Sequence, residues 1–421
     1  MAEKNIGTAK LFPILLVTFI NMLGMSVVLP FLVVIVLKMG GNALTYGLMG
    51  ATYSVFQLIG GPLLGSWSDQ AGRKKILLIC EIGTFVGWMV FIIGLLVPVD
   101  PLVNGVQHNG LFFSLPLILI FIARALDGLT GGSISVANAY LSDISTKAER
   151  KSNFGKISAS SNMGLIFGPL LAGLLGATKL GNLLPVIATA LISFVAIFVV
   201  YFFVHESHHR KESVDDKVVP GGSNGNLQKL GLFKVFKIAK VPYFLVLYFL
   251  IFLAFNFFYI GFPVYAAGEL HWSVLQLGIF FSFISGALVL VQGPLLSVLS
   301  KRFSGASLVI CGSLMLAVCF ACLTFNNLVV MYIGAFFFAL GNGLMWPSFV
   351  ALLSNTGDGD TQGAIQGIAS SAGSLASIVG LISGAFLFEV LHGNLFFVTA
   401  GFMAVIGLLA IPLIKIEKTM A

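Results

Sequence analysis

The feature that most constrains this chain is its long, unbroken apolar runs, such as LISFVAIFVVYFFV at residues 191–204. Backbone groups in lipid must be hydrogen-bonded within the protein, so only helices or a closed barrel can cross a membrane. Barrel strands alternate polar and apolar side chains, and this run does not. Only 9% of the residues are charged, against roughly a quarter in soluble chains. The sequence therefore predicts an all-α polytopic membrane protein.

A membrane-spanning helix needs about 20 predominantly apolar residues. The first such run is too long for the core of a signal peptide and lacks a small-residue cleavage pattern, so we expect it to remain as an anchor. Reading the chain for runs of this length predicts twelve transmembrane helices, at 11–37, 44–66, 76–98, 115–140, 154–177, 182–204, 241–267, 273–298, 306–325, 328–352, 362–390 and 394–415.

The positions of Lys and Arg agree with this count. If the N-terminus is cytoplasmic, the opposite side holds only Lys38 and Lys179, and Arg124 lies within a predicted span. All other cations among the 23 fall in predicted cytoplasmic segments, as the positive-inside rule requires. The net charge of +7 is therefore explained by topology, and we expect no nucleic-acid partner.

Two parts of the sequence repeat. The tetrapeptide GPLL occurs at residues 61–64 and again at 293–296, each time at the end of the second span of a six-span half. Between the halves lies a polar, Gly-rich and charged stretch that is typical of a linker. We expect an N-terminal six-helix bundle at 1–204, a cytoplasmic linker at 205–240 and a C-terminal six-helix bundle at 241–421, the architecture of a rocker-switch secondary transporter.

The stretch GPLLGSWSDQAGRKK resembles the loop signature G-x-x-x-D-R-x-G-R-R/K of the major facilitator superfamily. The matching residues are Gly65, Asp69, Gly72, Arg73 and Lys74. The resemblance implies a conformational latch, in which Asp69 caps the start of span eleven and a loop cation bridges it to an acid at the end of span four, here Asp143. Gln70 replaces the usual arginine, and Arg73 could substitute for it. The alternative is that these cations only enforce topology.

Span five narrows the resemblance to the twelve-span drug/proton antiporters, which include the tetracycline exporters. Its residues Gly155, Gly164, Gly168, Pro169 and Gly173 resemble the signature G-x8-G-x3-GP-x2-GG, with Ala172 in place of one glycine. The resemblance implies that this helix faces the other half and is associated with export by exchange. Small residues at this spacing also permit tight helix packing of a generic kind.

Span four resembles the family pattern R-x-x-x-G through Arg124 and Gly128. Span one departs from the tetracycline exporters, which carry an acid in the context D-x-x-G-x-x-x-x-x-P. The matching stretch, NMLGMSVVLP, has Asn21 at the position of the acid. An amide cannot bind and release a proton, so any coupling must depend on other residues.

Charged residues in the middle of a span are costly, by about 2.5–3.5 kcal/mol each, and indicate function. Arg124 and Asp127 share a helix face in span four, where pairing favours the charged acid and burial favours the protonated one. We predict that Asp127 carries protons and that Arg124 tunes it or holds substrate; a static, neutralised pair is the alternative. Glu81 is a second candidate for proton coupling, although an interfacial ion pair is the simpler interpretation.

Further polar and aromatic residues within spans are candidates for the substrate cavity, although each alone is typical of helix packing. They are Asn21, Gln57, Asn138, Asn162, Asn256, Tyr259, Asn342, Trp346 and Gln366.

No enzymatic chemistry is indicated. The sequence HESHH at 205–209 fits the zinc-protease pattern H-E-x-x-H, but it follows span six and has no visible third ligand. The Cys-x-x-Cys at Cys319 and Cys322 has no second pair, so we expect packing residues. No phosphate-binding loop occurs, and we expect no metal and no cofactor.

The resemblance and the residues together predict a secondary transporter that exports a small amphipathic drug or metabolite by proton antiport. The alternatives are a nutrient or metabolite uniporter or symporter, favoured by Asn21, and a transporter-like receptor that does not transport. We expect a monomer in a bacterial inner membrane, with both termini cytoplasmic and with the substrate, protons and the lipid bilayer as partners.

Overall fold

The structure is a computed structural model that describes residues 2–98, 106–108, 111–146, 149–207, 240–356 and 362–419. Almost all of these residues are helical, and a short antiparallel hairpin pairs Val106 with Phe113. By their contacts the residues divide into a first unit, Met1–His209 with Ile260–Ser285, and a second unit, Arg210–Tyr259 with Gly286–Ala421. The predicted division at 204 and 241 stays a prediction.

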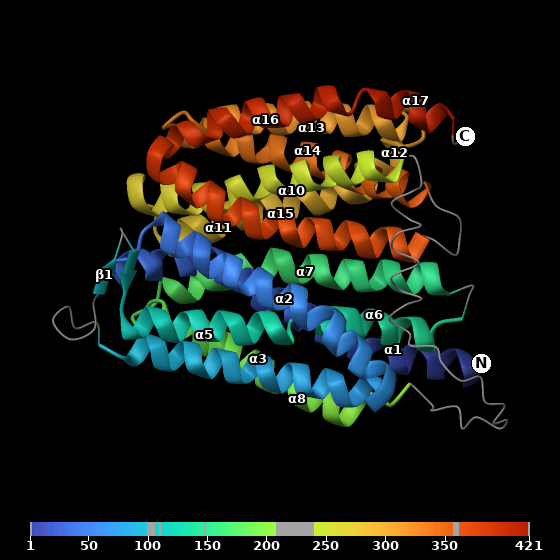
Figure 1. Ribbon diagram of the computed structural model, residues 1–421. Coiled ribbons are helices and arrows are strands. Elements are labelled where there is room, and N and C mark those ends of the chain that lie inside the picture. Colours follow the sequence, from blue (N-terminus) through green and yellow to red (C-terminus); the bar gives the residue numbers. More distant parts are fainter. Residues whose placement is uncertain are drawn as a thin grey trace, which may run out of the picture. The chain divides into compact units, whose positions relative to one another are not determined.

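The helices up to Phe203 are drawn from blue to green in Figure 1. The elements are α1 (Ala2–Lys38), α2 (Ala43–Ala71), α3 (Arg73–Leu96), β1 (Val106–His108), β2 (Leu111–Phe113), α5 (Leu115–Thr130), α6 (Ser133–Ile144), α7 (Arg150–Gly176) and α8 (Leu183–Phe203). Within the first unit, α1 packs along α7 and α8, and α2 packs along α5 and α6.

The remaining elements run from yellow to red in Figure 1. The helix at 305–323 packs along its neighbours at 328–354 and 395–409. The elements are α10 (Val241–Val264), η1 (Tyr265–Glu269), α11 (Val274–Leu290), η2 (Val291–Leu295), α12 (Leu296–Leu299), α13 (Gly305–Leu323), α14 (Leu328–Ser354), α15 (Gln362–Leu391), η3 (His392–Asn394), α16 (Leu395–Leu409) and α17 (Pro412–Lys418).

Several helices begin where a polar side chain accepts a hydrogen bond from the first turn. Asn42 caps α2 by accepting from the backbone N of Thr45 at 3.0 Å, and Ser304 caps α13 by accepting from Ser307 at 3.2 Å. Asn327 caps α14 in the same way, accepting from Val329 at 2.9 Å. These caps fix the boundaries between apolar runs.

Each predicted span lies on helix, but four of them, 115–140, 241–267, 273–298 and 394–415, are divided between two or more helical elements. Predicted span four divides into α5 and α6 at Gly131–Gly132, where a Cβ at Gly132 would lie 2.9 Å from the backbone oxygen of Gly60. The second GPLL falls in the π-helical turn η2, whereas the first continues inside α2. The proline of each GPLL, Pro62 and Pro294, removes one helix hydrogen bond.

Ten helical stretches of the described residues are long and apolar enough to cross a membrane. The last of them, Gly367–Lys418, contains both α15 and α16. The stretch Ala43–Ala71, which is rich in glycine and polar residues at its end, is not among the ten. The membrane-spanning helical class is therefore confirmed, and the count of twelve crossings stays a prediction.

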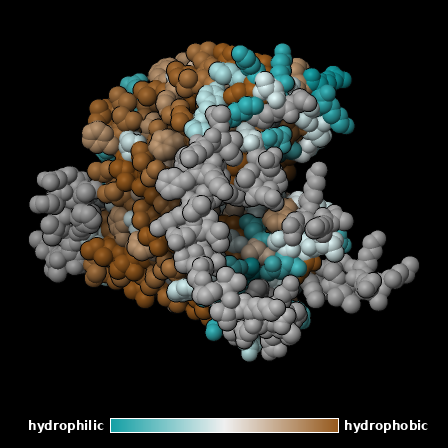
Figure 2. All heavy atoms as spheres, turned by 45° about the vertical axis from the view of Figure 1, so that its right-hand side comes forward, coloured by the Kyte–Doolittle hydropathy of each residue, from teal (hydrophilic) through white to brown (hydrophobic). Residues whose placement is uncertain are grey.

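The surface of the helices fits a lipid environment. Along α3, Ile79, Ile82, Val86, Met89 and Ile93 are exposed at the spacing of one helix face. Figure 2 shows hydrophobic side chains, in brown, over much of the surface in that view, with hydrophilic side chains gathered toward one end of the helices.

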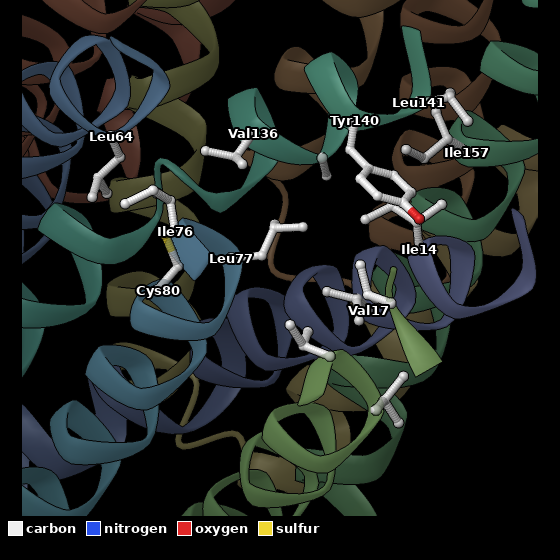
Figure 3. Close-up of a cluster of buried hydrophobic side chains, with 14 of the residues drawn as sticks. Ile14, Val17, Leu64, Ile76, Leu77, Cys80, Val136, Tyr140, Leu141 and Ile157 are labelled. Carbon is white, nitrogen blue, oxygen red and sulfur yellow. The ribbon is translucent and has the colours of Figure 1, made fainter. Parts of the chain in front are cut away.

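The core of the first unit includes a hydrophobic cluster formed by α1, α2, α3, α6, α7 and α8. Tyr140 is its largest labelled side chain and lies near Ile14 and Ile157 in Figure 3. Leu64 and Ile76 bring the ends of α2 and α3 into the same cluster. The cluster therefore fixes the end of α2, which carries Asp69, and the start of α3, which carries Arg73.

Candidate functional site

A group of buried and part-buried polar side chains lies inside the first unit, on helices that otherwise bury apolar residues. We call it the polar cluster; its members are Asn21 of α1, Tyr53 of α2, Glu81 of α3, Arg124 and Asp127 of α5, and Ser133 of α6. Every predicted proton-coupling residue belongs to it. Because polar groups in a membrane interior are costly, the concentration of so many on neighbouring helices indicates a functional site.

Asn21 and Glu81 contact each other directly. The Asn21 Nδ2 donates to Glu81 Oε1 at 2.9 Å and lies 3.2 Å from Ser133 Oγ. The Glu81 side chain is buried, and its second oxygen, Oε2, has no hydrogen-bond partner. Interpreting Glu81 as part of an interfacial ion pair is therefore wrong: no cation pairs with it among the described residues, and its face of α3 points into the bundle.

Arg124 and Asp127 form an ion pair, with Arg124 Nη1 at 3.1 Å from Asp127 Oδ2. The Arg124 guanidinium also lies over the ring of Tyr53, 4.7 Å from its centroid, which adds a cation–π contact. Gln57 Nε2 donates to the hydroxyl of Tyr53 at 3.1 Å. The predicted residues Arg124, Asp127 and Gln57 thus lie together near Tyr53.

A small pocket of about 30 Å³ opens among these side chains. Asn21, Tyr53, Asp127 and Ser133 line it, together with Trp88, whose indole Nε1 is buried without a hydrogen-bond partner. The pocket has room for water but not for a drug-sized molecule. Asp127 thus borders a space in which water could accept its proton.

Arg73 holds the loop between α2 and α3. Its Nη2 lies 2.6 Å from Asp69 Oδ1 and its Nε lies 3.0 Å from Asp143 Oδ2. A further bond runs from Nη1 to Ser68 Oγ at 2.6 Å. Arg73 thus joins the two acids of the expected latch in the absence of an arginine at Gln70, which is exposed. Residues 357–361, just before α15, lie outside the described part, so the capping of span eleven by Asp69 stays a prediction.

Glu206, the acid of the rejected zinc-protease pattern, caps the start of α3. Its carboxylate accepts hydrogen bonds from the backbone N of Arg73 at 2.8 Å and of Lys74 at 3.2 Å. The positive end of the helix dipole at this N-terminus stabilises its negative charge. Gly72 permits this approach with a φ of +99°. His208 and His209 lie outside the described residues. Among the residues that are described, no group of three His, Cys, Asp or Glu side chains could hold a metal ion.

The glycines of α7 make close contacts with two other helices of the first unit. A Cβ at Gly164 would lie 2.7 Å from the backbone oxygen of Phe19 in α1, and Gly168 lies against Ser26. At Gly173 a Cβ would lie 3.2 Å from Leu275 Cα in α11, and the oxygen of Pro169 lies next to Gly278. Gly155 is different, because a Cβ there would meet nothing within 4 Å among the described residues.

In the second unit, Asn256 is buried and donates to Ser377 Oγ at 3.2 Å, joining α10 to α15. Trp346 of α14 packs against Tyr248 and Phe252 of α10, with ring centroids 5.1 and 5.2 Å apart. Tyr259 is part-buried beside Phe338, and Asn342 is also part-buried. The side chain of Gln366 lies outside the described residues.

The two remaining candidates, Asn138 of α6 and Asn162 of α7, are part-buried. Sequence reasoning did not single out Tyr53, Ser133 or the capping role of Glu206. Tyr53 carried a usable signal, because it lies one helical turn before Gln57. Ser133 and Glu206 carried none, since their partners are distant in the sequence.

Comparison with known proteins places these features in a family. The family model described as Major Facilitator Superfamily matches residues 14–307 and 246–419. The chain belongs to the major facilitator superfamily. The chain is 26% identical over 409 residues to the tetracycline resistance protein, class B, of Escherichia coli, covering 94% of this chain and 91% of that protein. It is also 26% identical over 416 residues to multidrug resistance protein 2 of Bacillus subtilis (strain 168), covering 96% of each.

Among solved structures, the D-xylose–proton symporter resembles this chain with a TM-score of 0.75 at 15% identity, over 96% of this chain and 97% of that one. A likeness at this identity establishes the fold alone. The protein is therefore an integral membrane transporter of this superfamily and not an enzyme, and the resemblance to the drug-exporting branch is confirmed by its relatives.

Proposed function

We propose that this transporter exports small amphipathic molecules, such as drugs, in exchange for protons by alternating access. The observation that carries the proposal is the buried ion pair of Arg124 and Asp127 beside a water-sized pocket. An acid in the membrane interior, with a cation on one side and room for water on another, has the surroundings that proton exchange requires. The names of the relatives, tetracycline and multidrug resistance proteins, support export.

In this mechanism Asp127 binds and releases the proton. When the carboxylate is charged, Arg124 holds it at 3.1 Å. Protonation removes that attraction and frees Arg124, whose guanidinium remains stacked on Tyr53. Loss of the ion pair, while the contact with Tyr53 remains, would link the protonation of Asp127 on α5 to the position of α2, which carries Tyr53.

The latch around Arg73 and the glycines of α7 serve the conformational change. Arg73 joins α2, α3 and the end of α6 through Asp69 and Asp143. Because Asp69 is exposed and Asp143 is half-exposed, ion pairs with the buried Arg73 can form in one state and open in another. The close approach of α7 to α1 and α11 allows small helix shifts without displaced side chains.

The aromatic group of Tyr248, Phe252 and Trp346 in the second unit suits an amphipathic substrate with a flat apolar part. We further propose a monomer in a bacterial inner membrane with both termini cytoplasmic, in accord with the distribution of Lys and Arg.

The test is export from cells that overproduce or lack the protein, with a compound panel that includes tetracycline and ethidium. We expect overproduction to lower accumulation and raise resistance, and a protonophore to abolish both effects because it dissipates the gradient. Flux that survives the protonophore would favour a uniporter instead. Ligand binding without any flux would favour a non-transporting receptor.

The second candidate, a nutrient or metabolite uniporter or symporter, is favoured by one observation. Asn21 occupies the polar cluster where an acid would otherwise stand, so the cluster has one titratable group fewer on α1. Uptake of the compound driven by an inward proton gradient would identify a symporter. Equilibration of the compound across the membrane at a rate independent of the proton gradient would identify a uniporter.

A further inference from the structure

Glu81 lies in surroundings that differ from those of every other acid described in the first unit's helices. Its side chain is 1% exposed, and one of its two oxygens has no hydrogen-bond partner. The other accepts a single bond from the neutral amide of Asn21 at 2.9 Å. A carboxylate ion would need several donors or a cation to be stable in such a place.

Of the cations with described side chains on α1, α3 and the helices packed against α3, Lys38 and Lys75 are exposed, and the other three have partners of their own. Arg73 binds Asp69 and Asp143, Arg124 binds Asp127, and Lys74 lies 5.7 Å from the ring centroid of Tyr201. The titratable groups with described side chains on the helices around Glu81 are Lys38 on α1, Tyr46, Tyr53 and Asp69 on α2, Arg124 and Asp127 on α5, Tyr140 and Asp143 on α6, and Tyr201 on α8. None of them supplies Glu81 with a counter-charge.

We propose that Glu81 is an occluded proton-binding site, held in its neutral, protonated form by Asn21 in this conformation. The inference deepens the proposed function, on whose proton coupling it rests. Asn21 is the positioning residue: its amide donates to Oε1, so the proton of the acid resides on Oε2. Asp127, by contrast, lines the pocket that has room for water.

The site releases its proton only when α1 and α3 move apart. Glu81 is sealed between these helices and does not line the pocket of the polar cluster. Separation of Asn21 from Glu81 would let water reach the carboxyl group, which would then donate its proton to that water and become charged. The proton thus leaves Glu81 only in a state in which the contact between α1 and α3 is open.

The experiment is infrared spectroscopy of the purified protein in lipid nanodiscs, without any substrate. The carbonyl stretch of a protonated carboxyl group identifies a neutral acid directly. We expect the difference between wild type and Glu81→Gln to contain this band at neutral pH. Titration to alkaline pH should release about one proton fewer per molecule from Glu81→Gln. The control is Glu389→Gln, which removes an exposed acid on α15 and should leave the band unchanged.

A swap of the two groups tests the pairing itself. The double variant Asn21→Asp with Glu81→Gln exchanges acid and amide while keeping the length of each side chain. We expect it to regain a protonated-carboxyl band and the missing proton. Because the side-chain amide oxygen in Glu81→Gln can still accept from Asn21, a merely structural hydrogen bond would predict no change in either readout of the single variant.

A difference spectrum between wild type and Glu81→Gln that lacks this band would overturn the proposal, as would an unchanged number of released protons; a band from another acid, such as Asp127, is common to both proteins and cancels in the difference. Failure of the double variant to regain the band would overturn the positioning role of Asn21. These outcomes are separate from the proposed function: absence of proton-driven export in the wild type would refute antiport, while the infrared band would still report the protonation of Glu81.

Discussion

At the scale of residues, two carboxylates share one guanidinium at the start of α3. Arg73 is buried, and its planar group reaches Asp69 and Asp143 with different nitrogen atoms. A lysine has a single ammonium and cannot match this fork geometry. The two ion pairs therefore require an arginine at position 73, and not only a positive charge.

We predict that Arg73→Lys lowers export while the protein still inserts and folds, because the charge remains but one of the two bridges is lost. Transport of a panel compound in everted vesicles, normalised to the amount of protein, measures this. Lys75→Gln is the matched control, since Lys75 is exposed in the same helical turn. Export by Arg73→Lys equal to that of the wild type would show that positive charge alone matters at this position.

Gly72 is the second sensitive residue. Its φ of +99° is unfavourable for other residues, and a Cβ there would collide with the carboxylate of Glu206. We expect Gly72→Ala to destabilise the protein by about 1 kcal/mol or more, seen as a lower midpoint of thermal unfolding in detergent. Gly65→Ala, where a Cβ meets nothing within 4 Å, should leave the midpoint unchanged or raise it.

At the scale of elements, α7 carries glycines with different tasks. Gly164 lets the backbone of α1 approach, whereas Gly155 has free space around it. The spacing of the motif predicts both positions equally, and only the structure separates them.

The prediction for α7 compares these two sites. Gly164→Ala should reduce export and thermal stability, because the added methyl group would lie 2.7 Å from Phe19 O and 2.8 Å from Leu23 N. Gly155→Ala should be tolerated and can gain helix propensity of up to about 1 kcal/mol. The reverse order of the two variants would contradict the assignment of tight packing to Gly164.

The elements also show what the sequence could predict. Apolar runs predicted every long helix, since hydrophobic length alone determines a span. The break at Gly131–Gly132 and the π-helical turn η2 were not predicted, because the first depends on the approach of Gly60 and the second on local geometry at Pro294. The contact of Asn21 with Glu81 joins separate helices, and no local pattern encodes it.

At the scale of the whole molecule, the charges of the first unit form two groups with separate tasks. The ion pairs of Arg73 hold the loop between α2 and α3 and the end of α6. The polar cluster lies among the buried residues of the same helices and contains the acids Glu81 and Asp127. Proton binding in the cluster can therefore act on the same helices that the loop holds together.

The most direct measurement is proton movement by the purified protein in liposomes that contain a pH-sensitive dye. A gradient of tetracycline, or of whichever panel compound the cells export, is imposed without a pH gradient. Exchange predicts that protons move opposite to the compound, and that Asp127→Asn abolishes the dye signal. Movement of the compound in the wild type with no proton signal, or with protons in the same direction, would contradict the proposed antiport.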